Sequence, residues 1–585
     1  MAVAVDFETY YDKEYSIKIQ GVDGYIYDQR FDAYLVAIVG EGIEYVGHPK
    51  DFDWTRLNGK LLVAHNARFD ETVSIRLQEL GRICKFTPTE WRCTADLSVY
   101  MSAPRHLAGA AEQLLGVTMD KSTRAKMKGL TYAEACELGM KEEVHAYTLD
   151  DSRPCLQIWE KFSPLWPENE QRLSRLNRIQ GRRGVFIDRK LLDEGIEKLK
   201  LVQWEAEKNI PWDWSKNLTP LSPKKLRAQC REAGIYAPGS LAQTSVECIK
   251  WEEKYGDVYP WVGAMRNWRR SNILLKKLQT LERRIRPDGT FPFSLKYFGG
   301  HTGRWSGDGG FNMQNMPRGE LFGVDLRAMF IPRPGYKFVI SDFAQIEARI
   351  TLWLVGDLDM IAQVEAGHNV YEAHAIATMG WPSDKTLKKE DPALYQLAKA
   401  RVLGLGFGCG HKRFRALAEE QYGIVLTAAE AKKAVDDFRR SNPKITAYWR
   451  RLQDGLARSV KDRLFEIELP SGRDLSYFSV TSTDGYTAEL VRGSRRTHMY
   501  GGLLTENAVQ ATARDAFAEG MLRLVDAGYP PLFHVHDEYV LEVPEEDLKD
   551  VKFLTNIEQI ITQQPEWLPG CPMGAETVVT EKYLK

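Results

Sequence analysis

The sequence has few cysteines and no pairing pattern among them. Its eight cysteines are spread over 585 residues, and none of them shows the CxxC spacing typical of zinc sites. We therefore expect neither a zinc site nor a disulfide framework. The isolated cysteines fit a reducing compartment.

Long apolar runs are also missing. No stretch approaches the roughly 18 uninterrupted apolar residues of a membrane span. The first segment, MAVAVDFETYYDK, has no basic stretch followed by an apolar run and a cleavage site. We therefore expect a cytoplasmic protein with no membrane partner. Repeats and low-complexity tracts are absent too, and 43% hydrophobic content supports several packed domains.

An excess of basic charge is the third missing feature. The formal net charge is −1, so composition alone indicates no nucleic-acid partner, and any basic surface must be local. One candidate is RNWRRSNILLKKLQTLERRIR, which has a helical pattern. Its basic residues are Arg266, Arg269, Arg270, Lys276, Lys277, Arg283, Arg284 and Arg286, and its apolar side has Leu274, Leu275, Leu278 and Leu281. Such a segment alone is more often a solvated helix face.

The pattern of apolar runs divides the chain into regions. Over 1–165, short β-branched runs such as AVAVDFETY and AYLVAIVG alternate with helix-like segments, which predicts an α/β layered domain. A charged helical arm follows over 166–298. Then come a glycine-rich loop and a strand (299–357), a helical block (358–465), and mixed strands and helices (466–585). The predicted fold class is α/β and α+β, in several domains.

Acidic residues stand at three places in the first region. Asp6 and Glu8 lie two apart at the end of an apolar strand, so their side chains project from the same face. Asp70 follows the apolar run of LLVAHNARFDETV. Tyr147 and Asp151 are four apart on a predicted helix and share a face. The first pair alone would most often be an exposed strand end, but three such places alternating with core segments indicate a cation site.

This order resembles the DxE, NxxxD and YxxxD elements of the proofreading exonuclease domain of family A DNA polymerases. The elements here are Asp6 with Glu8, Asn66 to Asp70, and Tyr147 to Asp151. By that resemblance the four acids hold two divalent metals, one generating hydroxide and the other stabilising the leaving 3′ oxygen, while Tyr147 orients the attacking water. Hard oxygen ligands favour Mg²⁺ or Mn²⁺ over zinc. Asp96 matches a further common element in a supporting role.

Two more acidic segments lie in the second half of the chain. YKFVISDFAQIEARI predicts a strand that ends at Asp342, followed by a helix with Glu347 and Arg349. In FHVHDEYVLEV, Asp537 and Glu538 stand at the tip of two apolar runs, as in a hairpin. Two strand ends bearing aspartates can flank one pair of metal ions. Either segment alone would be no more than a polar β-turn.

Together these segments resemble motifs A and C of family A DNA polymerases, the relatives of bacterial DNA polymerase I. The resemblance implies that Asp342 and Asp537 are the catalytic metal ligands where the primer 3′-hydroxyl attacks the triphosphate in line. It implies that Glu347 closes off the 2′ side of the sugar, which favours DNA over RNA synthesis. The supporting residues that it implies are Glu538 beside the metals, His536 near the primer end, Gln345 at the dNTP and Arg349 at the DNA.

The segment LYQLAKARVLGLGFGCGHKRF combines a helical spacing with four glycines. Lys399, Leu403 and Phe407 are spaced i, i+4, i+8 and so share a helix face. Each glycine costs a helix up to ~1 kcal/mol, so either something approaches the backbone closely or the helix bends. A glycine-lined core helix and a nucleotide-binding helix fit these residues about equally.

This segment resembles the nucleotide-binding fingers helix of the family. The resemblance implies that Lys399 binds the triphosphate, that Leu403 lies at the dNTP, and that Phe407 lies beside the templating position. Tyr395 stands where the family has a second cation, and Leu403 where it has phenylalanine. Other cations open to phosphate contact are Arg401, His411 and Lys412. An alternative alignment gives Arg401 the role of the lysine, but Lys399 also puts an aromatic at the expected spacing.

Two polar blocks extend the resemblance. HTGRWSGDGGFNMQNMPRG resembles the start of the family's palm, and GGLLTENAVQATARDAF its helix with template contacts. The implied DNA contacts are Arg304, Gln314 and Asn315 in the first block and Asn507, Gln510 and Arg514 in the second. Minor-groove acceptors are nearly the same for every correct base pair, so polar contacts there check geometry without reading sequence. Alone, the blocks would be a polar loop and an amphipathic helix.

The motifs follow the family's order over essentially the whole chain. The resemblance implies a ribonuclease H-like exonuclease domain (1–165) and a right-hand polymerase with thumb (166–298), palm (299–357 and 466–585) and fingers (358–465). It implies a monomeric, phage-type replicative enzyme that uses primer–template DNA, dNTPs and two Mg²⁺ per active site, with Mn²⁺ as substitute. Two rivals are an exonuclease with a decayed polymerase half and a single-subunit RNA polymerase, which should lack the exonuclease elements and Glu347.

Overall fold

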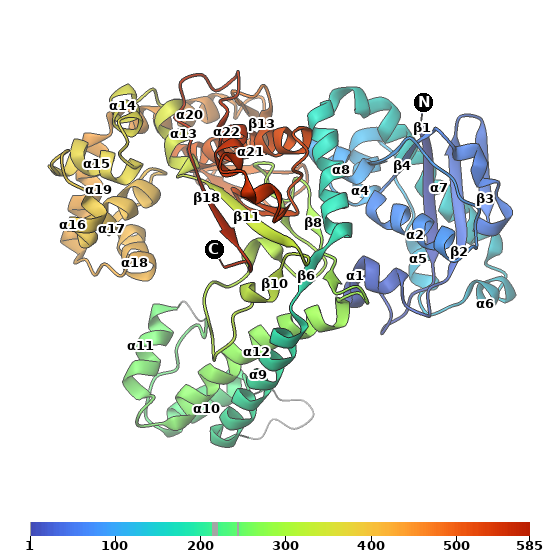
Figure 1. Ribbon diagram of the computed structural model, residues 1–585, viewed down its shortest axis with the longest axis horizontal. Coiled ribbons are helices and arrows are strands. Elements are labelled where there is room, and N and C mark those ends of the chain that lie inside the picture. The colour runs from blue at the N-terminus through green and yellow to red at the C-terminus, as the bar shows by residue number, and fades with distance from the viewer. Residues whose placement is uncertain (1, 213–219, 243–244, 585) are drawn as a thin grey trace.

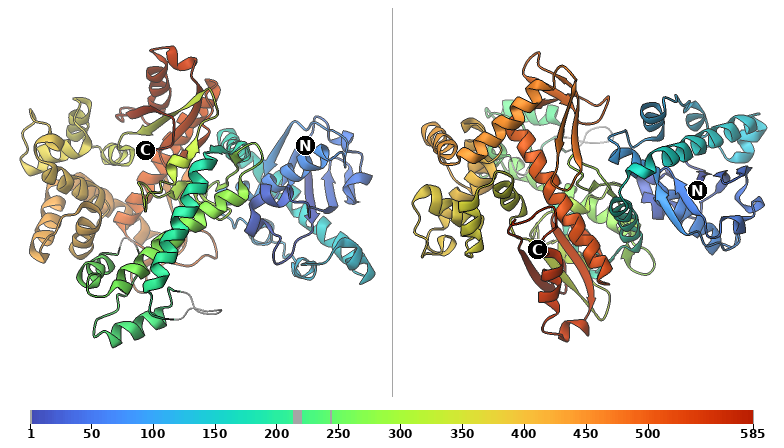
Figure 2. Two further views of the ribbon diagram at one scale, coloured as in Figure 1. Left: turned by 60° about the horizontal axis from the view of Figure 1, so that its bottom comes forward. Right: turned by 90° about the horizontal axis from the view of Figure 1, so that it is seen from above.

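The computed structural model describes residues 2–212, 220–242 and 245–584. In Figure 1 the N-terminal α/β region lies on the right, two long helices descend from the centre, and a helical bundle lies on the left. The two views of Figure 2 show that this bundle and the N-terminal region flank the central sheet on opposite sides. Within the described ranges, no helix is long and apolar enough to cross a membrane.

The N-terminal region is a five-stranded sheet of order β3-β2-β1-β4-β5, in which only β2 runs antiparallel to its neighbours. Its strands are β1 (Ala2–Thr9), β2 (Ala33–Gly40), β3 (Ile43–Gly47), β4 (Leu61–Ala64) and β5 (Glu90–Cys93). Its helices are α1 (Ile17–Ile26), α2 (Ala67–Glu79), α3 (Thr94–Tyr100), α4 (Leu107–Leu115), α5 (Ser122–Lys126), α6 (Tyr132–Glu137) and α7 (Lys141–Phe162). The α/β layered prediction is confirmed.

Strand β1 shows why its acids end up on one face. Val3 and Val5 enter the core on one side of the sheet, whereas Ala2 and Ala4 enter the core on the other, beneath α7. Since strand side chains alternate, Asp6 continues the alanine side.

The helical arm contains α8 (Glu168–Arg183), α9 (Arg189–Asn209), α10 (Pro223–Glu232), α11 (Val246–Tyr255) and α12 (Pro260–Arg284). The long helices α9 and α12 pack side by side (Figure 1), and the four leucines predicted for the apolar side of α12 are buried. The predicted basic surface is only partly free, because Arg266 is buried against Glu252 and Arg286 pairs with Asp23 of the N-terminal region. The arm is also not wholly helical, since β6 (Val185–Ile187), β7 (Thr290–Phe291) and β8 (Leu295–Lys296) lie within it.

The central sheet is antiparallel, with the order β16-β17-β11-β18. Its strands are β11 (Tyr336–Phe343), β16 (Phe533–Val535), β17 (Glu538–Pro544) and β18 (Ala575–Thr580), and its helices are α13 (Ile346–Leu354), α21 (Gly501–Asp526) and α22 (Phe553–Thr562). Smaller sheets contain β9 (Ser306–Gly307), β10 (Phe330–Ile331), β12 (Leu464–Glu468), β13 (Asp474–Thr481), β14 (Tyr486–Glu489) and β15 (Thr497–Met499). The predicted strand at 336–343 and the predicted hairpin at 533–544 are confirmed.

The helical bundle at the left of Figure 1 contains α14 to α19 and leads into α20, which packs on α21. Its elements are α14 (Leu358–Glu365), α15 (Val370–Met379), α16 (Leu387–Glu390), α17 (Pro392–Ala400), the π-helix η6 (Arg401–Leu405), α18 (His411–Tyr422), α19 (Ala428–Ser441) and α20 (Pro443–Arg458). Capping boxes at Asn369 and Thr427 begin two of these helices, as the pattern of a polar cap followed by glutamate dictates.

The predicted common helix face of Lys399, Leu403 and Phe407 is wrong in part. The α-helix ends at Ala400, one π-turn follows, and Phe407 lies in the turn beyond it. The repeated glycines predicted either a bend in the helix or a close approach to its backbone, and both occur here. Gly408 has φ +80°, where the chain turns, and a Cβ on Gly502 would lie 2.2 Å from the carbonyl oxygen of Phe407, so the backbones approach closely.

Arg514 on α21 is buried and joins three parts of the chain. Its guanidinium pairs with Glu170 on α8 and donates from Nε to the carbonyl oxygen of Gly303 at 3.0 Å. It also lies over the rings of Phe298 and Trp305. Its side chain is 1% exposed in this structure, and its predicted DNA contact stays a prediction.

We expect Arg514→Ala to lower the free energy of unfolding by about 3–5 kcal/mol, because Glu170 would keep a buried charge without its partner. Thermal or urea unfolding of the full chain measures this. The matched control is Arg172→Ala, which breaks an exposed pair with Asp526 between the same two helices and should cost below about 1 kcal/mol. If Arg514→Ala instead weakened primer–template binding at unchanged stability, the side chain would face DNA.

Candidate active sites

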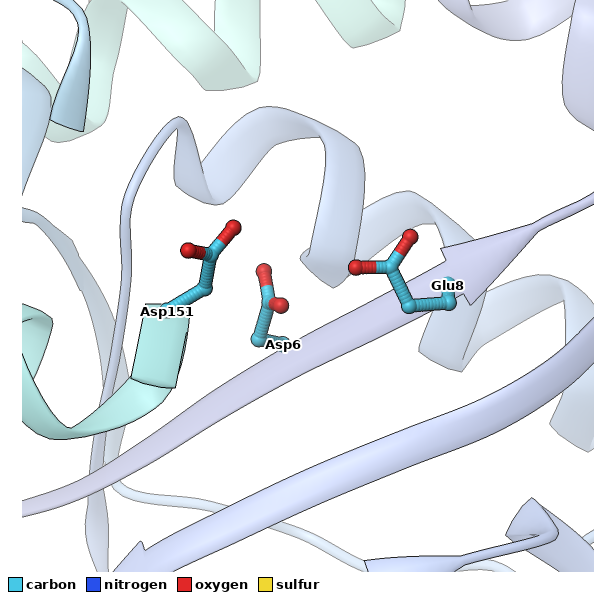
Figure 3. A group of neighbouring side chains, drawn as sticks. All are labelled: Asp6, Glu8 and Asp151. Atoms are coloured by element: carbon cyan, nitrogen blue, oxygen red, sulfur yellow. The ribbon is translucent and has the colours of Figure 1, made fainter. Parts of the chain in front are cut away.

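The first site is a group of carboxylates beside the N-terminal sheet. Asp6 and Glu8 come from β1 and Asp151 from α7, and one ligand oxygen of each lies within 4.8 Å of the others. Figure 3 shows the three carboxyl groups on one side of β1. The α7 helix crosses β1 and β2, so it brings Asp151 to residues that lie about 145 positions earlier in the chain. Such a group of oxygen donors can hold a hard cation.

The other two predicted ligand positions are arranged differently. Asp70, in the first turn of α2, is buried, and its Oδ1 accepts the N–H of Phe7 on β1 at 3.1 Å. It therefore borders the carboxylate group without joining its closest set. Asp96 is buried as well and binds Arg105 at 2.6 Å and the Ser174 hydroxyl at 2.6 Å. Asp96 therefore joins α3 to α8 through the Ser174 hydroxyl.

Burial and mutual repulsion shift the pKa values of these acids. Burial raises the pKa of Asp6 to about 7, and the Asp151 charge adds to this effect, whereas Lys121 and Arg124 oppose it. Burial, followed by Asp6, raises the pKa values of Glu8 and Asp70 as well. Charges held this close are costly unless a cation compensates them.

Two further groups complete the site. Tyr147 lies one turn before Asp151 on α7 and is buried, and burial together with Asp151 raises the pKa of its hydroxyl, which stays protonated. Lys121 donates from Nζ to Asp151 Oδ1 at 2.5 Å. This lysine was not predicted from the sequence. Its only signal was a run of basic residues, KSTRAKMK.

The second site lies at the end of the central sheet. Asp342 is paired in register with Glu538, and the Phe343 N–H donates to the Asp537 carbonyl oxygen at 3.2 Å. The two aspartates therefore stand side by side. Burial raises the pKa of Asp537 to about 7, and the neighbouring Asp342 adds to the effect. Like charges that raise a pKa in this way mark a place where a cation is favourable.

Gln314 supports the turn between β16 and β17. Its Nε2 donates to the His534 carbonyl oxygen at 3.0 Å, and its Oε1 accepts the N–H of His536 at 2.8 Å. His536 has φ +56° and is exposed, so the amide stabilises a backbone conformation that few side chains adopt. Gln314 is buried and both ends of its amide hold this turn, and its predicted contact with the minor groove stays a prediction.

Glu538 also faces inward. It is buried, and its Oε1 accepts the Tyr583 hydroxyl at 2.7 Å. The Arg327 guanidinium lies over the Tyr583 ring at 5.0 Å. Glu538 is thus anchored at the base of the turn beside Asp537, and its assisting role at the metals stays a prediction.

The residues that follow Asp342 reach three different partners. Gln345, at φ +55°, accepts the Val370 N–H at 2.9 Å and so ties the start of α13 to α15. Glu347 forms an ion pair with Arg304. Arg349 donates to the Pro572 carbonyl oxygen at 3.2 Å, which directs it toward the C-terminal strand, so its predicted DNA contact has no support here.

The cations of the helical bundle differ in exposure. Lys399 is half-buried, and its Nζ lies 5.9 Å from the ring centroid of Tyr371, which in turn packs edge-on against Tyr395. Arg401 is buried, which makes Lys399 the more accessible of the two cations, and the alternative role of Arg401 stays untested. His411 and Lys412, at the start of α18, are exposed. Tyr371 was missed by the sequence analysis, because nothing local distinguishes it from a core tyrosine.

The remaining polar candidates are Asn315, Asn507 and Gln510. Asn315 is exposed. Asn507 is half-buried and donates to the Tyr477 hydroxyl at 3.0 Å, and the Gln510 Oε1 accepts the Thr302 hydroxyl at 2.6 Å. These contacts leave Asn315 and, in part, the two amides of α21 open to a ligand.

The sequence pattern of DNA polymerase family A matches residues 222–585, which is more than half of the chain. This chain belongs to DNA polymerase family A. Similar to it are the DNA polymerase of Bacillus phage SP02, 27% identical with 89% of each chain covered, and DNA polymerase I of Aquifex aeolicus strain VF5, 25% identical with 90% of this chain and 89% of the other covered.

The fold is also that of a solved polymerase structure. The polymerase domain of Pol1 from M. smegmatis, in complex with DNA primer-template and dNTP, has a TM-score of 0.68 and 18% identity, with 99% of this chain and 95% of that chain covered. DNA-directed DNA synthesis is thus the activity of this family A polymerase. The matched range includes Asp342 and Asp537, whereas the Asp6 group lies outside it.

The pKa shift at Asp6 gives a stability prediction for the metal-free polymerase. Its folded pKa of about 7 lies above the unfolded value near ~3.9. The folded state therefore retains a proton that the unfolded chain loses, and stability falls as pH rises from about 4 to about 7. We expect Asp6→Asn to raise the free energy of unfolding at pH 8 by on the order of 2 kcal/mol, and to change it little at pH 4.

Unfolding in the presence of a chelator, at both pH values, measures this effect. Asp12→Asn is the control, because backbone N–H groups of Tyr15 and Glu14 lower the pKa of Asp12, so this change should not stabilise at pH 8. If Asp6→Asn left the free energy of unfolding at pH 8 unchanged, the positive charges of Lys121 and Arg124 would already offset the repulsion among the carboxylates.

Proposed function

We propose that this family A polymerase extends a primer 3′ end with dNTPs at Asp342 and Asp537 and removes 3′-terminal nucleotides at the Asp6 group, as a proofreading exonuclease. The observation that carries the proposal is the presence of two separate carboxylate sites, one on β11 and the β16–β17 turn and one on β1 and α7. The elements around Asp342 and Asp537 lie in the range that matches DNA polymerase family A, and the elements around Asp6, Asp70 and Asp151 resemble that family's exonuclease motifs in spacing.

The residues of both sites fit Mg²⁺, with Mn²⁺ as a substitute. Asp6, Glu8 and Asp151 offer converging oxygen ligands, and the pKa values of Asp6 and Asp537 are raised to about 7 by burial and by neighbouring acids. Paired divalent ions supply an activated nucleophile and stabilise the leaving oxygen. Asp342 and Asp537 would hold one pair; the three converging acids, with Asp70 at their border, would hold the other.

At the polymerase site, the chain's own residues bind and orient the nucleotide. Lys399 binds the triphosphate, since it is the half-buried cation beside Tyr371. Glu347 borders the sugar, and its carboxylate excludes a 2′-hydroxyl. Leu403 and Phe407 flank the base at the end of the π-turn, while Gln345 fixes the start of α13 against α15.

Primer–template DNA is the proposed macromolecular substrate. Arg304, Asn315, Asn507 and Gln510 line its minor groove, and His536 lies near the primer end because it is exposed next to Asp537. The M. smegmatis structure contains a primer-template and dNTP, which supports this assignment. The proposed thumb (166–298), palm (299–357 and 466–585) and fingers (358–465) surround that DNA, and the phage relative favours a role in phage genome replication.

At the exonuclease site, the protonated Tyr147 hydroxyl donates a hydrogen bond to the attacking water. This hydrogen bond orients the water toward the terminal phosphate. Its burial next to Asp151 keeps that proton in place. Region 1–165 would form the ribonuclease H-like domain that holds this site.

Separate substitutions should separate the two activities. We expect Asp537→Ala to reduce nucleotide addition by about 10³-fold or more while primer degradation persists, because only one set of metal ligands is lost. Asp6→Ala with Glu8→Ala should do the reverse. A gel assay of a labelled primer–template with Mg²⁺, with and without dNTPs, measures both activities. Equal loss of both in either folded variant would refute the two-site proposal.

Glu347 gives a second prediction. Glu347→Ala should lower the ratio of dNTP to rNTP efficiency by at least about tenfold, because space opens beside the 2′ position. Single-nucleotide incorporation kinetics measure the ratio. Glu347→Gln keeps the size and should keep most of the discrimination. An unchanged ratio in Glu347→Ala would contradict the role, and preferred rNTP use by the unaltered chain would favour an RNA polymerase instead.

A further inference from the structure

The connection between α4 and α6 brings basic side chains to the exonuclease carboxylates. This segment, residues 116–131, is called the basic strap here. Its Lys121 donates from Nζ to Asp151 Oδ1 at 2.5 Å, and the same ammonium lies 5.1 Å from the ring centroid of Tyr147. One side chain of the strap therefore touches both residues that α7 contributes to the site.

The basic strap is tied to the site at several points. The Gly129 N–H donates to the Tyr11 carbonyl oxygen at 2.9 Å, and the Tyr11 hydroxyl donates to the Arg124 carbonyl oxygen. The Thr123 hydroxyl donates to Glu143 on α7 at 2.8 Å. The strap is thus fixed to the chain just after β1 and to α7, and β1 and α7 carry the acids.

The ion pair differs from an ordinary surface pair. Asp151 is only 12% exposed, whereas Lys121 is 34% exposed. An ammonium at 2.5 Å occupies a carboxylate that also belongs to the metal-binding group with Asp6 and Glu8. A divalent ion at that group would compete with the ammonium for the same oxygen, and the half-buried lysine has a flexible four-carbon stem on which the ammonium can swing outward.

We propose that Lys121 neutralises Asp151 in the metal-free protein, yields this carboxylate to the divalent ion, and then contacts the phosphate of the 3′-terminal nucleotide. This inference rests on the proposed exonuclease function. Lys121 is a positioning and substrate-binding residue in this scheme, and no bond to it forms or breaks. A released ammonium beside the site favours the negative phosphate of an incoming strand.

The proposal predicts opposite effects on two ligands. Lys121→Met removes the competitor of the metal, so the Kd for Mn²⁺ at this site should fall about threefold to tenfold, and it removes a phosphate contact, so the KM for a single-stranded oligonucleotide should rise about tenfold. Calorimetry with Mn²⁺ and 3′-degradation kinetics measure the two. Both are run on the full chain with Asp537→Ala, to weaken metal binding at the polymerase site.

Lys126→Met is the matched control, because Lys126 lies on the same strap but pairs with Glu143, away from the cluster, at 2.7 Å. It should leave both quantities unchanged, and Lys121→Arg should keep the KM near that of the unaltered chain. Weaker binding of both metal and oligonucleotide in Lys121→Met would indicate a purely structural strap and overturn the proposal. No change in either would also overturn it.

Failure of the proposed function has a different signature. If the unaltered chain degrades no 3′ end, and Asp6→Ala with Glu8→Ala leaves Mn²⁺ binding unchanged, then the exonuclease assignment and this inference both fall. If the unaltered chain degrades 3′ ends and only Lys121→Met lacks its two effects, the exonuclease stands and the role of the strap falls alone.

Discussion

Repulsion between carboxylates at the ends of buried strands is the constraint on which both sites depend. Asp6 lies close to Glu8 and Asp151, and Asp537 lies beside Asp342, so that burial and neighbouring charge raise the pKa of Asp6 and of Asp537 to about 7. Such clusters persist only where the surrounding core fixes the strands. Here β1 is held between β2 and β4, and β11 between β17 and β18. The packing free energy of the two sheets therefore offsets the free-energy cost of holding the carboxylates close together.

Buried polar contacts around the polymerase site serve the same constraint. Gln314 uses both ends of its amide to fix the turn at His536, and Glu538 is anchored by Tyr583. Arg514 joins α21 to α8 from within the core. Polar residues around the turn at Asp537 thus divide into two classes: buried ones that form hydrogen bonds within the protein, such as Gln314, and exposed ones, such as Asn315.

Local pattern predicted the strands that carry the acids, because a period of two or a four-residue spacing depends only on neighbours in sequence. It also predicted Tyr147 and Asp151 on one helix. Contacts between distant residues had no such signal. Lys121 reaches Asp151 across 30 residues, and Arg514 reaches Glu170 across 344. The π-turn after Ala400 was missed for a related reason, since repeated glycines indicate that a helix bends but not how.

Specific polar contacts join the N-terminal region to the helical arm. Asp23 pairs with Arg68 and with Arg286, just after α12, and Arg105 donates to the Tyr297 carbonyl oxygen. Because each contact needs a particular partner, the N-terminal region cannot slide freely over the arm, as two apolar faces could. In the proposed function, a mispaired primer end therefore has to leave the turn at Asp537 and travel to the Asp6 group, rather than wait for the exonuclease to approach it.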